Sequence, residues 1–441
     1  MIDLDPAAPP EGVAGSPVRS DLAVSAEAMG RRPVVRFFAS VFLSLYGDWL
    51  TTVALVVLLY ELTGTPAGPA GYVLARVAPR VIGPWIGGSL ADRFSPRRVM
   101  IMAALVQGAF TASLVFADRA HAVWALYAAV AIAQFVGSLA RPSQGALLPA
   151  LVPRRQLTQA NAVYGTLFST SIFVAPAIGA ALLVHTGPDV LFLIDAGTFA
   201  VGAMLVATLP SGRAASVPPP PPAARIPKPS TFAMAMRDPS IRLVAAASAA
   251  MGLTPTVAQA LLVVAARERF GGDAAVGILY SAVGLGGTLG GLLAFKWRPP
   301  RIHFRLAIFC AAVIQSVSLA SFAAIAGRVP GLILLAVSTV ASAAFDVWAI
   351  TEIQRRAPLG YMGRFNAIVW AAMYAGMLIG AVWALGTANL LHWDLALELA
   401  CLAMAILVGA VGITGHDDPA AKPSEPVPPP PTPTPQSRVN A

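Results

Sequence analysis

Charged side chains inside long apolar segments are the residues of this sequence whose chemistry is most informative. An ionised side chain is costly inside a bilayer unless it is paired, so such a position is a functional hypothesis by default. The residues of this kind that we single out are Asp48, Arg76, Arg80, Asp195 and Asp346. A carboxyl group near arginines can take up and release a proton, or it can form a fixed ion pair that braces two helices. These residue types therefore predict proton coupling or substrate contact, with helix bracing as the alternative.

Asp48, Arg76 and Arg80 are expected to meet within the bilayer. Residues 36–60 and 70–91 are consecutive apolar segments that would cross it in opposite directions. Because a helix rises by about 1.5 Å per residue, Asp48 lies at a depth between those of the two arginines. A fixed ion pair and a protonatable acid tuned by the arginines both fit this arrangement.

Asp195 and Asp346 belong to later apolar segments. Asp195 lies near the beginning of its segment, where we expect a helix-bracing acid more than a functional one. Asp346 lies towards the inner end of its segment, where it could meet substrate or a proton. The alternative for Asp346 is a pair with Arg355 or Arg356.

The elements that must position these residues are membrane-spanning helices. Of the 441 residues 57% are apolar and 12% are charged, whereas soluble domains are roughly half apolar and about a quarter charged. A span needs about 20 apolar residues, and membrane strands would be shorter and would alternate. Twelve segments are long enough, namely 36–60, 70–91, 98–117, 121–141, 158–184, 189–209, 241–265, 273–295, 303–326, 329–351, 362–386 and 390–414. The composition therefore argues against a soluble enzyme.

The distribution of basic residues predicts the topology. If the N-terminus is cytoplasmic, most of the 30 Lys and Arg residues fall in cytoplasmic segments, and only Arg119, Arg267, Arg269 and Arg328 fall in outside loops. This bias matches the positive-inside rule and predicts that both termini are cytoplasmic. The net charge of +9 then reports topology and contact with anionic lipid, not nucleic-acid binding.

Composition also divides the chain into five parts. Residues 1–33 predict a disordered cytoplasmic tail, and residues 416–441 predict a second, Pro-rich one. A cytoplasmic Pro-rich linker at 211–239 separates a first half at 34–210 from a second half at 240–415. Each half holds six of the predicted spans, a plan common among transporters.

The clearest motif lies between the second and third spans. It reads Gly-Ser-Leu-Ala-Asp-Arg-Phe-Ser-Pro-Arg-Arg over residues 88–98. Here the chain resembles the major facilitator superfamily, whose corresponding loop reads roughly G-x-x-x-D-R-x-G-R-R, with Ser95 and Pro96 as departures. The resemblance implies a breakable conformational latch, made by Gly88, Asp92, Arg93, Arg97 and Arg98. A plain basic turn is the alternative reading.

A proline motif in the fifth span resembles the antiporter signature of the same superfamily. It contains Ala175, Pro176 and Gly179, with several of the family's glycines replaced. Proline removes a backbone hydrogen bond and glycine permits close packing, so a helix bend is expected here. A packing kink and a marker of proton antiport are equally compatible with the motif.

Pairs of glycines spaced by four residues predict faces where helices pack closely. These pairs are Gly83 and Gly87, Gly286 and Gly290, Gly287 and Gly291, and Gly376 and Gly380.

A more specific resemblance is to the branch of the superfamily that contains macrolide exporters and the enterobactin exporter. It rests on Gly47-Asp48, Ala91 to Phe94, Leu151 to Pro153, Asn161-Ala162 and Asp195. It implies an all-α polytopic membrane protein with twelve transmembrane helices in two pseudo-symmetric halves of six. The implied function is proton-coupled export, by alternating access, of a hydrophobic or amphipathic small molecule such as a drug, macrolide-like compound, siderophore or secondary metabolite. The alternatives are proton-coupled uptake of a small nutrient and a non-transporting membrane scaffold or sensor.

Residues for other chemistries are missing from the sequence pattern. The five histidines lie at loops or span ends without metal-ligand spacing, and there is no phosphate-binding G-x-x-x-x-G-K-[ST]. Cys310 and Cys401 lie far apart in apolar segments, which argues against a disulfide framework. We therefore expect no enzyme activity, cofactor or metal. The expected partners are a small-molecule substrate, protons and the lipid bilayer, for a monomeric antiporter of the inner membrane with a role in drug resistance.

Overall fold

The computed structural model describes residues 31–153, 156–210, 238–296, 304–325, 327–356 and 362–414. Within these ranges the chain forms long α-helices joined by short turns and contains no strand. The predicted tails at 1–33 and 416–441 and the linker at 211–239 lie outside the described residues, except for residues 31–33, 238 and 239.

The helices correspond one to one with the twelve predicted spans. The first half contains α2 (Arg31–Thr63), α3 (Ala67–Arg93), α4 (Pro96–Arg119), α5 (Val123–Leu151), α6 (Leu157–Thr186) and α7 (Pro188–Ala207). The second half contains α9 (Pro239–Ala265), the π-helical turn η2 (Ala266–Phe270), α10 (Ala274–Lys296), α11 (Phe304–Ala324), α12 (Arg328–Arg356), α13 (Met362–Thr387) and α14 (Trp393–Thr414). Ten of them, all but α3 and α14, are long and apolar enough to cross a membrane by length and composition alone. The chain is an all-α polytopic membrane protein, as predicted.

Local sequence signals determine where several helices begin. Ser95 caps α4 by accepting a hydrogen bond from the Arg98 amide, and Pro96 occupies the first helical position. Asp238 caps α9 in the same way, through the amides of Ser240 and Ile241. Ser95 and Pro96 thus start α4 directly after the end of α3 at Arg93, and Asp238 starts α9 at the end of the predicted linker.

The two halves share one packing pattern, which confirms the predicted pseudo-symmetry. In the first half α2 packs on α6 and α7, α3 packs on α5, and α4 packs on α5 and α7. In the second half α9 packs on α13 and α14, α10 packs on α12, and α11 packs on α12 and α14. The halves meet mainly where α6 packs on α10 and where α3 packs on α13.

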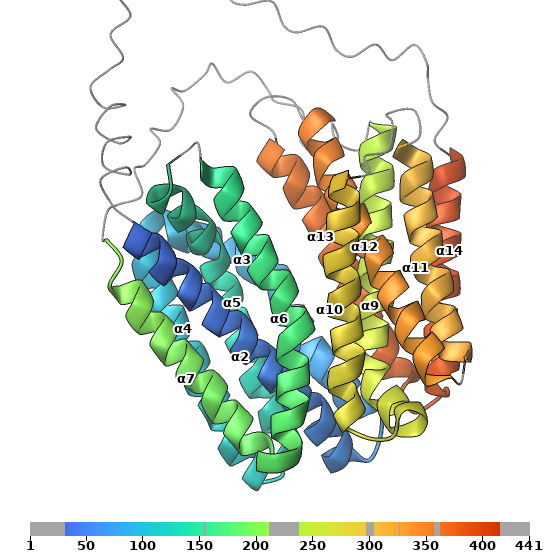
Figure 1. Cartoon of the computed structure of the whole chain (residues 1–441), viewed down its shortest axis with the longest axis horizontal. Coiled ribbons are helices and arrows are strands. Elements are labelled where there is room, and N and C mark those ends of the chain that lie inside the picture. Colours follow the sequence, from blue (N-terminus) through green and yellow to red (C-terminus); the bar gives the residue numbers. More distant parts are fainter. Residues whose placement is uncertain are drawn as a thin grey trace, which may run out of the picture.

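The two ends of the molecule differ. One end, the short-loop face, carries the turns at residues 64–66, 120–122, 187, 271–273 and 388–392, and the end of α11 and the start of α12. The other end, the linker face, carries the beginnings of α2 and α9 and the ends of α7 and α14. The two bundles lie close together near the short-loop face and further apart towards the linker face (Figure 1).

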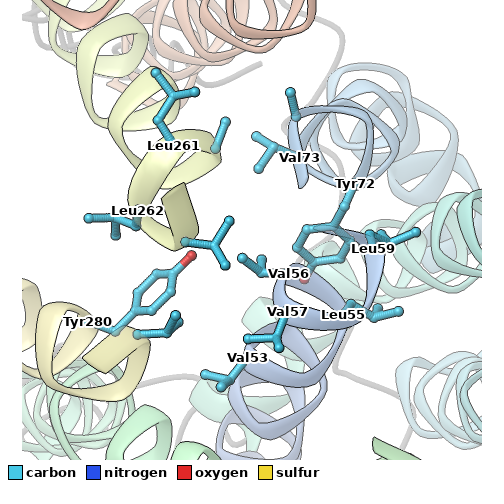
Figure 2. Close-up of a cluster of buried hydrophobic side chains, with 14 of the residues drawn as sticks. Val53, Leu55, Val56, Val57, Leu59, Tyr72, Val73, Leu261, Leu262 and Tyr280 are labelled. Carbon is cyan, nitrogen blue, oxygen red and sulfur yellow. The ribbon is translucent and has the colours of Figure 1, made fainter. Parts of the chain in front are cut away.

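The apolar core follows the same asymmetry. Near the short-loop face a single core contains side chains from both halves, and Figure 2 shows Val56 and Tyr72 of the first half opposite Leu262 and Tyr280 of the second. Towards the linker face each half has a core of its own. Phe37 and Leu148 belong to one and Ile241 and Phe345 to the other. The halves are thus sealed at the short-loop face and separate at the linker face.

Three of the four predicted glycine pairs lie at helix contacts. A Cβ at Gly83 or Gly87 would meet α5, one at Gly286 or Gly290 would meet α12, and one at Gly376 or Gly380 would meet α9. The prediction is wrong for Gly287 and Gly291, whose Cβ positions have no neighbouring atom within 4 Å. One residue along a helix is a rotation of about 100°, so these two glycines face away from α12.

Candidate functional site

A polar cavity lies inside the first half and not between the halves. Its volume is about 130 Å³, and residues from each of α2 to α7 line it. Its polar lining includes Ser44, Asp48, Arg80, Gln107, Gln134 and Arg141. Six apolar helices therefore enclose an interior lined by polar and charged side chains, which is the arrangement expected of a functional site in a membrane protein.

A second, smaller cavity adjoins the first. Asp48, Gln107, Gln134 and Phe199 line both cavities, and the second one extends to Asp195. Its volume of about 20 Å³ is enough for about one water molecule. Polar space thus continues from Asp48 towards the second buried carboxyl group.

Asp48 lies at the junction of the two cavities and is half-buried. Arg76, Arg80 and Arg141 all lie within electrostatic range of its carboxyl group. Among the described residues, however, no direct ion pair joins Asp48 to an arginine. The structure brings the predicted cluster together without forming the fixed ion pair that was its simpler reading.

The two arginines of α3 have different surroundings. Arg80 donates from Nε to Oε1 of Gln134 on α5, at 3.0 Å. Arg76 is only 9% exposed, and its guanidinium lies over the Trp49 ring at 5.2 Å from the centroid. Trp49 in turn contacts Tyr280 of the second half, with 5.4 Å between ring centroids. Arg80 therefore faces the interior of the first half, whereas Arg76 lies at the seal between the halves.

Asp195 connects α7 to α2. Its side chain is 1% exposed, and it accepts a hydrogen bond of 2.6 Å from the Thr51 hydroxyl. A Cβ on Gly47 would lie 2.1 Å from Oδ1 of Asp195, so only glycine leaves room for this carboxyl group against α2. Gly47 thus leaves room for the Asp195 carboxyl group, whereas the adjacent Asp48 lines the two cavities.

The latch loop binds the end of α7. Arg97 donates from Nη2 to the carbonyl oxygen of Ala207, in the last turn of α7, where a cation is favourable to the helix dipole. Arg93 and Arg98 are exposed. Gly88 and Asp92 belong to the last turns of α3, but the side chain of Asp92 lies outside the described part of the structure. The contact of Arg97 with α7 had no signal in the sequence beyond the basic residue itself.

The proline motif of α6 lies at the contact between the halves. Ala175 is fully buried, and Gly179 packs against Leu50 of α2. On the other side of α6, a Cβ at Gly277 of α10 would be 2.8 Å from the Pro176 carbonyl oxygen. One turn further along, the Ser281 hydroxyl donates to the Phe173 carbonyl oxygen at 2.8 Å. The α6 motif is recognisable in the sequence, whereas Gly277 and Gly284 of α10, which pack against it, are not.

Asp346 stands apart from this site. Its side chain is exposed on α12 and does not line either cavity. An exposed carboxylate on an apolar helix is expected to face polar space and not lipid. The side chains of Arg355 and Arg356, its predicted alternative partners, lie outside the described residues. Within the described ranges no group of three His, Cys, Asp or Glu side chains is arranged to hold a metal ion.

An ionic contact at the short-loop face, which sequence reasoning missed, joins the two halves. Arg267 of η2 pairs with Glu61 of α2 at 3.2 Å and with Asp273 at 2.5 Å. Its guanidinium also lies 4.6 Å from the centroid of the Tyr60 ring. We call Arg267, Glu61 and Tyr60 the short-loop clasp. In sequence Arg267 was merely one of the few basic residues of the outside loops.

Comparison with known proteins shows which family and which relatives this chain resembles. The family model described as Major Facilitator Superfamily matches residues 37–381. The enterobactin exporter EntS of Salmonella typhimurium (strain LT2) is 28% identical over 358 residues, which cover 78% of this chain and 83% of that protein. An uncharacterized MFS-type transporter of Bacillus subtilis, YfiS, is 25% identical over 181 residues, but these cover only 41% of this chain and 43% of the relative.

Solved structures share the fold at low sequence identity. A peptide transporter POT superposes with a TM-score of 0.70 at 12% identity, over 86% of this chain and 93% of that one. A bacterial homologue of the iron transporter ferroportin gives 0.66 at 16% identity, over 86% and 98%. The family match covers most of the two helical halves, and the neighbours share their arrangement. The chain belongs to the Major Facilitator Superfamily.

Proposed function

We propose that this chain is a proton-coupled exporter of a hydrophobic or amphipathic small molecule, which it moves without chemical change. The observation that carries the proposal is Asp48, a carboxyl group that lines the polar cavity among three arginines and has no direct ion pair with them. A fixed structural pair would hold both partners in contact. A carboxyl group open to a cavity is instead free to exchange a proton.

The orientation in the membrane belongs to the same proposal. Arg93, Arg97 and Arg98 lie at the linker face, and the positive-inside rule then assigns that face and both termini to the cytoplasm of a bacterial inner membrane. With this orientation the molecule is closed outside and open inside. Rocking of the two halves about their contacts would expose the space between them to the outside.

Similarity to EntS supports export and the class of substrate. The relative is an enterobactin exporter, and enterobactin is therefore the first siderophore to test beside drugs, macrolide-like compounds and secondary metabolites. The breadth of this panel follows from the largely apolar helices between which a substrate would pass. We propose that a monomer suffices, because each half and their seal are completed within one chain.

Efflux of this substrate panel tests the proposal in cells that lack their other pumps. Cells that produce the wild-type chain should retain less substrate than cells without it, and a protonophore should abolish the difference. Asp48→Asn should raise retention to the level of cells without the chain. Glu398→Gln is the matched control, because Glu398 is an acid of α14 that lines neither cavity. Normal expression with unchanged efflux in Asp48→Asn would contradict the role of Asp48. Uptake in place of efflux would contradict export.

A further inference from the structure

The two adjoining cavities form a polar route inside the first half. Every residue that lines them belongs to α2, α3, α4, α5, α6 or α7. The larger cavity begins near the linker face, where Ser40 and Gln144 line it, and the smaller one ends at Asp195. A molecule that passes between the halves would not travel along this route.

The hydrogen bonds of Asp195 leave a place for a proton. The Thr198 hydroxyl lies 2.7 Å from the main-chain oxygen of Asp195 and 3.2 Å from its Oδ1. A hydroxyl group has one proton to donate, so it can satisfy only one of these two acceptors. A proton on Oδ1 would let the carboxyl group donate to Thr198 while Thr198 donates to the main chain. Both contacts are then hydrogen bonds.

Asp48 and Asp195 also influence one another. Their carboxyl groups interact electrostatically, and both border the smaller cavity. Two neighbouring carboxyl groups in a poorly solvated site repel when both are ionised, which favours one proton shared between them. The other charged groups within electrostatic range of Asp48 are Arg76 and Arg80 of α3 and Arg141 of α5. The remaining polar groups of the smaller cavity, Thr51, Tyr72, Gln107, Thr111 and Gln134, are uncharged.

We propose that Asp48 and Asp195 form a proton-holding pair that exchanges with the linker face through the polar cavity of the first half. Protons and substrate then take separate routes. The inference rests on the proposed function, to which it adds a second carboxyl group and a path. Its competitor is that Asp195 only braces α7 against α2. The substitution Asp195→Asn distinguishes a proton-holding role from a bracing role. Asparagine keeps the size of the side chain and an acceptor for Thr51 but cannot exchange the proton.

Infrared difference spectra of the full-length chain in lipid membranes test the pair. Spectra between about pH 5 and about pH 9, which brackets ordinary and shifted carboxyl groups, should show a carboxylic C=O band. Asp48→Asn and Asp195→Asn should each remove roughly half of the band or more, because each supplies one of two coupled sites. Glu398→Gln should keep it.

The outcomes separate this inference from the proposed function. Loss of the band in Asp48→Asn with a wild-type band in Asp195→Asn would overturn the pair and leave the coupling role of Asp48 intact. A band that depends on both residues, in a chain whose efflux ignores a protonophore, would support the pair and overturn proton-coupled export.

Blocking the cavity tests the route without changing either carboxyl group. In a chain carrying Cys310→Ser and Cys401→Ser, Ser44→Cys introduces a thiol into the cavity lining. A membrane-impermeant thiol reagent applied from the linker face should then abolish the fast shift of the carboxylic band in D₂O. Lys296→Cys, exposed at the end of α10, is the matched control and should leave the shift unchanged when labelled. Equal shifts in the two labelled variants would overturn the route.

Discussion

At the residue scale, chemistry could be located from the sequence but partners could not. Asp48, Arg76, Arg80 and Asp195 are conspicuous because charges are rare in apolar segments. Gln134, which receives the hydrogen bond of Arg80, is an uncharged residue of a kind found in many helices. Partners come from helices far apart in the chain, so only the packing of the six helices reveals them.

Gly47 provides the most specific prediction at this scale. Gly47→Ala would place a Cβ 2.1 Å from Oδ1 of Asp195 and 2.5 Å from Oγ1 of Thr198. Forcing a methyl group into a packed contact costs about 1–3 kcal/mol, so the melting temperature of the purified chain should fall. Gly197→Ala on α7 is the matched control, because nothing lies within 4 Å of its Cβ position. Equal melting temperatures for the two variants would show that α2 and α7 yield to the extra atom.

At the element scale, the positions of the helices could be predicted from the apolar segments, but the contacts between helices could not. The twelve segments matched the twelve long α-helices of the described residues, because a span needs an uninterrupted apolar run and satisfies its own backbone hydrogen bonds. The glycine pairs carried less information. Gly286 and Gly287 are neighbours in equivalent sequence contexts, yet only the first meets α12. Which side of a helix faces a neighbour depends on rotation about its axis, and composition does not fix this rotation where every side is apolar.

The seam between α6 and α10 gives the prediction for this scale. A Cβ at Gly284 would lie 2.3 Å from the Phe173 amide nitrogen, and backbone cannot move aside as a flexible side chain can. Gly284→Ala should therefore push the two halves apart along this seam and lower transport while each half stays folded. An overpacking cost of about 1–3 kcal/mol corresponds to a change of about 5- to 150-fold in the equilibrium between states.

Efflux, expression level and protease resistance of each half would measure this effect. Gly287→Ala, one turn along the same helix and open around its Cβ position, should behave as wild type. Reduced transport in both variants would mean that helix α10 itself, and not its seam with α6, responds to the added methyl group.

At the scale of the whole molecule, the architecture was predictable and its conformational state was not. Twelve spans, two halves and a resemblance in one loop were enough to indicate the major facilitator fold. No pattern in the sequence distinguishes the end where the halves share one core from the end where each has its own, because apolar side chains form all three cores. The short-loop clasp belongs to this scale, since Arg267 and Glu61 are far apart in the chain and come from different halves.

The clasp predicts how the closed end is held. Exposed ion pairs contribute about 0.2–1 kcal/mol and are weakened by salt, and the contact of Arg267 with the Tyr60 ring contributes about 0.5–1 kcal/mol more. Removing the charge in Glu61→Gln should therefore shift the population towards the state that is open at the short-loop face, by up to about fivefold. Spin labels on opposite halves of that face, at Thr65 and at the exposed Ala274, would report the shift as a longer distance in pulsed electron resonance.

A second ion pair at the same face supplies the control. Arg119 and Asp189 lie 2.9 Å apart, and both belong to the first half. Asp189→Asn removes a similar exposed charge without touching the contact between the halves, so the label distance should not change. Because high salt screens both pairs, it should lengthen the distance in the wild type and have little further effect in Glu61→Gln. If Glu61→Gln and Asp189→Asn gave the same distances, the apolar core around Val56 and Leu262 would suffice to hold the halves together at this end.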